Sequence, residues 1–358
     1  MHFPPEQLAA LRAFGYTEAE ARFLYLVAAH SGYFTLRQFL AFAEAKSGKR
    51  NAQLVEKLFR LGHANARRYT RRNLVFQLRS RQIYAAIGKA HLRHRRDHDL
   101  AHIKTRLLAL DFILANSEES YFETAEEKRR FFIENFNAEE NLFLPINKGG
   151  GGISFAEGFP LYLAYLPPDF LPVVTFTYLD PEPRSLDRYL AHLRMYRPLF
   201  QLLPRFQFLY ISTASGKHEE AAQLFSFVVE GNGLADLGRY FDLETKWAHE
   251  QYGRLTEADV LFLSEGKKRY TGEIIERLYY LWKRKQLPED FQPEATTASL
   301  AGRKILFRAV TMPGQEGVFG GRAKNWGDGW EVRGGSRAAS LRRMQPTQKQ
   351  ILQSATDA

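Results

Sequence analysis

The chain has 358 residues, 45% of them hydrophobic, and a formal net charge of +10; this length predicts two or three domains with packed cores. It contains no Cys, which excludes disulfides, thiol nucleophiles and Cys-based zinc sites. No apolar run is long enough to span a bilayer, and the N-terminus MHFPPEQLAALRAFGY lacks the pattern of a signal peptide, so we expect a cytoplasmic protein without a membrane partner.

The charge is unevenly distributed along the chain. Residues 1–110 hold 20 Lys and Arg against 7 Asp and Glu, whereas residues 111–291 hold 20 against 28. A basic head on an acidic body is typical of a module that binds a polyanion. A solvated basic surface is the alternative interpretation of the same charges.

The beginning of the chain predicts two short helices with defined starts. Thr17 and Glu20 have the spacing of a capping box, and Thr35 and Gln38 repeat it. Apolar residues follow each box at helical spacing. Residues 31–34, between the two helices, are expected to form a small strand.

Residues 47–78 predict a third helix followed by a hairpin. After a turn at 47–50, a helix is expected over 51–61, and two β-prone runs then flank the basic turn Thr70-Arg71-Arg72-Asn73. The helix would bury Leu54, Val55, Leu58 and Phe59, and would direct Asn51, Gln53, Glu56, Lys57 and Arg60 outward.

This order of elements over residues 1–88 is typical of a winged helix-turn-helix. In that fold the third helix enters the major groove, and the hairpin, or wing, meets phosphates or the minor groove. The residues expected to contact double-stranded DNA are Arg37, Lys49, Arg50, Asn51, Gln53, Lys57, Arg67, Arg68, Tyr69, Arg71 and Arg72. A small helical domain with a solvated basic hairpin is the alternative, and winged helices also bind proteins or RNA.

Residues 89–116 predict one long connecting helix, basic in its first half and apolar in its second. His91, His94 and His98 would share one face of it, a spacing that could bind metal. The neighbouring Arg93, Arg95 and Arg96 disfavour a bound cation, so a solvated or phosphate-facing helix is the better interpretation.

The body, residues 117–291, predicts a small α/β domain with a helical extension. Strands are expected at 159–164, 173–179 and 206–211, and helices at 124–136, 185–200 and 217–229. A strand–helix–strand unit implies a parallel pair of strands. Residues 232–286 are expected to be helical, with an amphipathic helix over 270–285, and the glycines of 148–152 to form a flexible loop.

The last segment, residues 292–358, is rich in Gly, Ser, Arg, Gln and Thr and shows no lasting periodicity. We expect one strand at 304–310 and a low-complexity, disordered tail after it.

Three segments, LVAAHSGYFTLRQFLAF, VEKLFRLGHANARRY and VVTFTYLDPEPRSLDRYLAHLRMYRPLF, resemble the plasmid replication-relaxation family. The resemblance covers residues 15–230. It implies a winged helix followed by a domain related to the restriction-endonuclease-like fold, with Asp180 after a body strand and Tyr196 in the next helix. It also implies a role in plasmid or mobile-element replication, transfer or transcription.

The chain departs from an active nuclease of that fold. Such an enzyme needs a Glu-x-Lys strand to hold and use a divalent metal, and the strand ending at Asp180 has neither Glu nor Lys. Asp169, Asp180 and Glu182 could form at most an irregular acidic cluster. A surface loop in which acidic residues flank prolines is the favoured interpretation. We therefore expect no catalytic residues, no metal and no cofactor.

The sequence favours an α+β, non-enzymatic DNA-binding protein that regulates transcription or plasmid or mobile-element replication or transfer. We expect a homodimer, paired through 89–116 or 270–285, with replication or transfer proteins as possible partners. A metal-dependent nuclease, and an adaptor that docks a protein partner on the winged helix, are the alternatives.

Overall fold

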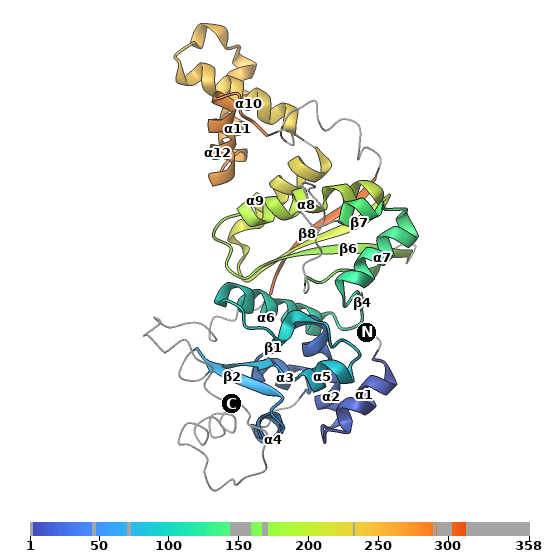
Figure 1. Ribbon diagram of the computed structural model, residues 1–358. Helices are drawn as coiled ribbons and strands as arrows, with labels where there is room; N and C mark the ends of the chain where they lie inside the picture. Colours follow the sequence, from blue (N-terminus) through green and yellow to red (C-terminus); the bar gives the residue numbers. More distant parts are fainter. Residues whose placement is uncertain are drawn as a thin grey trace. The chain divides into compact units, whose positions relative to one another are not determined.

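The computed structural model describes residues 3–44, 48–69, 73–143, 159–166, 171–231, 233–288, 291 and 303–312. These residues form a mixed α+β structure, as expected, and divide into two compact units (Figure 1). The first unit consists of the described residues up to Lys128 together with 159–164 and Met312. The second unit consists of the described residues of 129–154 and 165–311. The expected connecting helix thus falls inside the first unit.

The first unit opens with short helices and a hairpin. Its elements are α1 (Pro5–Arg12), α2 (Glu18–Leu26), a π-turn (Val27–Ser31), β1 (Tyr33–Phe34), α3 (Leu36–Phe42), α4 (Gly48–Arg60), β2 (Ala64–Arg68), β3 (Leu74–Leu78) and α5 (Arg81–Ala86). Both predicted capping boxes are present, at Thr17 with Glu20 and at Thr35 with Gln38. Each box pairs two backbone N–H groups that a helix start otherwise leaves without a partner.

The three strands form an antiparallel sheet in the order β1-β3-β2, with Ala66 opposite Phe76 and Tyr33 opposite Gln77. The predicted strand and hairpin are therefore confirmed. Because side chains alternate along a strand, Phe34 and Phe76 share one face, where their rings stack 5.2 Å apart and join the helical core. Tyr33 and Val75 share the other face.

The helix α6 (Leu100–Ala115) covers that second face, because Ile103 and Leu107 pack with Tyr33 and Val75. The prediction of one helix over 89–116 is wrong. Gly88, with φ +72°, follows the end of α5, and Asp99 caps α6 by accepting from the His102 N–H. A short 3-10 turn, Arg93–Arg95, lies between them.

The expected histidine face does not form, because residues 91–98 contain one short 3-10 turn and no α-helix. His94 is buried with its Nε2 3.2 Å from the Ala29 carbonyl oxygen, and the ring of His98 stacks on His102. The unit continues with β4 (Ser120–Tyr121), which pairs with β5 (Tyr162–Leu166), and with the start of α7 (Ala125–Phe136). The strand expected at 159–164 begins later, since Pro160 has no N–H to donate to a neighbour.

The second unit is built on three parallel strands in the order β6 (Leu171–Asp180), β7 (Arg205–Ser212) and β8 (Lys304–Thr311). The predicted parallel pair and the last strand are confirmed. Helices α8 (Asp187–Leu202) and α9 (His218–Phe225), with a π-turn over Ser226–Glu230, lie along one face of these strands (Figure 1). Phe200 and Phe225 pack there against Phe208.

Three further helices follow in the predicted helical extension: α10 (Leu234–Ala248), α11 (Glu257–Arg269) and α12 (Glu273–Lys283). Residues 270–272 are not part of α12, because Gly272 precedes it with φ +105°. Single 3-10 turns occupy Glu140–Phe143, Ser215–Lys217 and Tyr252–Arg254. Among the described helices, none combines the length and apolar character needed to cross a bilayer. The glycines of 148–152 and the tail from 313 lie outside the described residues.

Candidate nucleic-acid interface

The first two turns of α4 present polar and basic side chains to solvent. Leu54, Val55 and Leu58 are fully buried and fix the orientation of the helix. Lys49, Arg50 and Gln53, all expected to contact DNA, are exposed on the remaining surface. Arg50 Nη1 lies 3.4 Å from the Ala43 carbonyl oxygen. The start of this helix can therefore offer two cations and one amide to a polyanion.

Asn51 and Lys57 do not belong to this exposed surface. Asn51, predicted to point outward, is fully buried, and within the described residues its amide has no hydrogen-bond partner. Lys57 donates to Glu20 Oε2 at 2.6 Å, and Glu20 is itself buried. Asn51 lies three residues before Leu54 and seven before Leu58, so its place on the apolar stripe was a signal in the sequence.

Arg37 connects two elements of the first unit. Its Nη2 lies 2.9 Å from both carboxylate oxygens of Asp111, which is buried on α6. The Arg37 side chain remains 49% exposed, so the ion pair holds the guanidinium without removing it from solvent. Nothing in the sequence pointed to Asp111, because the two residues are 74 positions apart.

The end of the hairpin carries the other expected contacts. Arg67 and Arg68 end β2, opposite Val75 and Leu74. The Arg67 guanidinium carbon lies 5.5 Å from the centroid of the Tyr69 ring, a cation–π arrangement. All three residues are partly exposed. Arg71 and Arg72 lie outside the described residues.

The acidic cluster considered for a nuclease is not assembled around an open site in the described chain. Asp180 accepts a 2.6 Å hydrogen bond from the Tyr210 hydroxyl, and burial raises the pKa of its carboxyl group. Glu182 is exposed, and Asp169 lies outside the described residues. Among the residues placed, no three His, Asp or Glu side chains are arranged to hold a metal ion.

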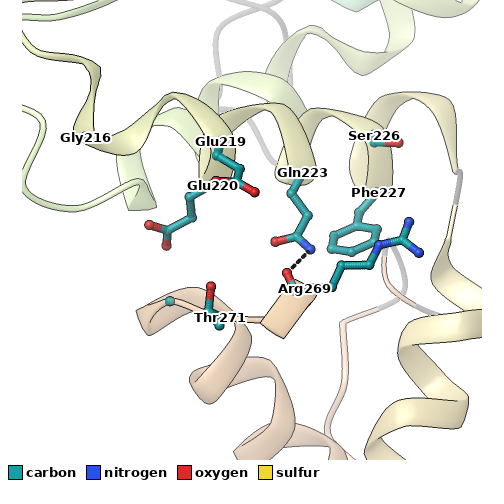
Figure 2. A pocket seen from close by; sticks show the side chains of 9 residues that line it. Gly216, Glu219, Glu220, Gln223, Ser226, Phe227, Arg269 and Thr271 are labelled. Atoms are coloured by element: carbon teal, nitrogen blue, oxygen red, sulfur yellow. Dashed lines mark hydrogen bonds between the residues drawn. The ribbon is translucent and has the colours of Figure 1, made fainter. Parts of the chain in front are cut away.

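A cavity of about 420 Å³ lies in the second unit between α9 and the residues that join α11 to α12 (Figure 2). Glu219 and Glu220 line it, and the Gln223 amide donates to the Arg269 carbonyl oxygen across it at 2.9 Å. Glu220 also accepts from Lys217 at 2.6 Å. With two carboxylates and one guanidinium in its lining, this cavity is a poor match for phosphate.

Of the expected DNA contacts, Lys49, Arg50 and Gln53 lie at the exposed start of α4, while Arg67, Arg68 and Tyr69 form a separate group at the end of the hairpin. Comparisons with protein-family models, curated proteins and solved structures found no match for this chain.

Proposed function

We propose that this protein binds double-stranded DNA through its first unit, used as a winged helix-turn-helix, and that it regulates transcription or plasmid or mobile-element replication or transfer without being an enzyme. The order α2, β1, α3, α4, β2, β3 supports the winged-helix interpretation, since it matches the order of that motif. The parallel β6 and β7 joined by α8 support, for the second unit, a relation to an inactive restriction-endonuclease-like domain.

The observation that carries the proposal is the exposed start of α4. A recognition helix reads base edges with its N-terminal residues, and Lys49, Arg50 and Gln53 occupy the first two turns. Arg and Lys suit guanine, and Gln suits adenine. Farther along the helix Leu54, Val55 and Leu58 are buried and Lys57 is held in an ion pair, whereas Glu56 and Arg60 are exposed.

We expect the protein to bind as a homodimer, because helix-turn-helix proteins commonly pair on two half-sites. The amphipathic helix α12 is the better candidate for pairing, because it carries an exposed Tyr280. The apolar side chains Ile103 and Leu107 of α6 are already packed against the sheet of the first unit. The second unit would contact replication or transfer proteins.

The test is fluorescence anisotropy of the whole protein on random duplex DNA over a salt series. We expect steeply salt-dependent binding, and the double variant Lys49→Ala, Arg50→Ala should flatten the log–log slope by about 2. The matched control removes two exposed cations of the second unit, Arg254→Ala and Lys268→Ala, and should leave the slope unchanged above about 0.1 M salt, where these charges are screened. Absence of binding at low salt would overturn the proposal and favour an adaptor that docks a protein.

A further inference from the structure

The loop of residues 92–99, between α5 and α6, is anchored in the core of the first unit. Leu92 and His94 are buried, and His94 Nε2 lies 3.2 Å from the Ala29 carbonyl oxygen. Gly32 makes this approach possible, because a Cβ there would lie 2.7 Å from His94 Cβ, and its φ is +78°. The loop therefore has a fixed position.

The same loop is attached to the outer face of the three-stranded sheet. The carbonyl oxygen of Arg96 accepts from the Tyr33 hydroxyl at 3.1 Å and from Gln77 Nε2 at 2.5 Å. Tyr33 belongs to β1 and Gln77 to β3, so both strands hold one backbone atom. These side chains share the face opposite Phe34 and Phe76, and hence opposite α4.

The side chains left outside this anchored backbone are arginines. Arg93, Arg95 and Arg96 are exposed, and they surround the buried His94 in the sequence. The anchors are Leu92, His94 and the backbone of Arg96, and the three arginine side chains extend from them to exposed positions. An exposed row of guanidinium groups on a fixed backbone is suited to phosphate oxygens.

The two acidic residues of the loop, Asp97 and Asp99, each have a contact outside the three arginines. Asp97 lies 3.5 Å from Arg79 Nη1, and Asp99 accepts from the His102 N–H at 2.7 Å at the start of α6. His98 is partly buried beside Tyr33, and burial together with Arg106 lowers its pKa, so it adds no charge near neutral pH.

The hairpin end reaches the same face. Tyr69 packs against the cluster of Tyr33, Val75, Ile103 and Leu107, with Arg67 over its ring. The hairpin end and the loop are therefore both in contact with Tyr33, Tyr69 through the apolar cluster and Arg96 through its carbonyl oxygen.

We propose that Arg93, Arg95 and Arg96 form a second phosphate-binding surface, which extends the duplex DNA contact of the first unit beyond α4 and the hairpin. This inference rests on the proposed function. The loop carries no element that enters a groove, so its contribution is to the phosphate backbone and is independent of base sequence.

The experiment measures salt-dependent anisotropy on two duplexes of unrelated sequence with the whole protein. The triple variant Arg93→Ala, Arg95→Ala, Arg96→Ala should flatten the log–log slope by about 3 and weaken binding equally on both duplexes. The control Arg184→Ala, Arg254→Ala, Lys268→Ala removes the same charge from exposed positions of the second unit and should change neither quantity above about 0.1 M salt, where these charges are screened. Lysine at all three loop positions should restore the slope.

The outcomes separate the two proposals. If the wild type binds steeply and the loop variant keeps the wild-type slope, the loop inference is overturned and the proposed function stands. If the alanine variant changes circular dichroism and the lysine variant does not restore the slope, the loop is structural and the inference fails. If the wild type binds no duplex at low salt, both proposals fail together.

Discussion

At the scale of single residues, two lysines of α4 have different expected roles. Lys57 contributes to stability, and Lys49 contributes to DNA binding. Lys57 neutralises Glu20, which is 5% exposed and whose Oε2 also accepts from the Thr17 N–H at 2.7 Å. Removing the ammonium leaves a buried charge with less compensation, so Lys57→Ala should lower the free energy of unfolding by about 1–3 kcal/mol. Lys49→Ala, at an exposed site, should change it by less than about 0.5 kcal/mol.

Urea unfolding and DNA anisotropy on the same two variants check this. The affinity of Lys49→Ala should fall, while that of Lys57→Ala should stay near the wild type once the protein is folded. The reverse pattern would mean that the ion pair with Glu20 opens and Lys57 reaches the DNA.

His30 makes the first unit sensitive to acid. Burial, with Lys128, Lys89 and Arg106 nearby, lowers its pKa to about 3. In the unfolded chain the imidazole binds a proton near pH 6.5, so between these values the unfolded state binds more protons and stability falls as pH falls. From about pH 7.5 to about pH 5 this residue should cost about 2 kcal/mol of unfolding free energy.

Urea unfolding at these two pH values should show a loss about 2 kcal/mol smaller in His30→Phe than in the wild type. The exposed His249→Phe should keep the wild-type loss. An equal loss in all three proteins would mean that His30 is protonated in the folded state.

At the scale of elements, α6 packs against one face of the three-stranded sheet of the first unit. Ile103 and Leu107 are fully buried against Tyr33 and Val75, whereas Leu100 on the same helix is 43% exposed. Ile103→Ala or Leu107→Ala should therefore lower the free energy of unfolding by about 2–5 kcal/mol, and Leu100→Ala by much less. Denaturant melts of the three variants test this. Equal effects would show that the helix does not need its apolar side chains to stay in place.

The elements show which signals in a sequence suffice for prediction. Capping boxes at Thr17 and Thr35 were predictable because their partners lie three residues away. The loop before α6 is not predictable from the local sequence, because its basic residues and histidines have helical spacing. The groups that hold residues 92–99 in place, Tyr33 and Gln77, lie on β1 and β3. The same limit applies to the candidate site. The ion pairs of Lys57 with Glu20 and of Arg37 with Asp111 join residues that are distant in the sequence, so only the folded chain reveals them.

At the scale of the whole molecule, charge separates the N-terminal third of the chain from its middle. All proposed DNA contacts lie in residues 1–110, where cations outnumber acids 20 to 7, while residues 111–291 are acidic, with 28 acids to 20 cations. The acidic body should repel DNA over a distance set by screening, which falls from about 20 Å at low salt to about 8 Å at physiological ionic strength.

Neutralising three exposed acids of the second unit, with Asp236→Asn, Glu257→Gln and Glu265→Gln, should therefore tighten duplex binding several-fold near 0.02 M salt and leave it unchanged near 0.15 M. The loss of affinity in Lys49→Ala, Arg50→Ala should persist at both, because a direct phosphate contact is lost. Anisotropy at the two salt concentrations measures both effects. A gain that survives at 0.15 M would place the second unit within a few ångströms of the DNA, and the interface would then include acidic residues of the body.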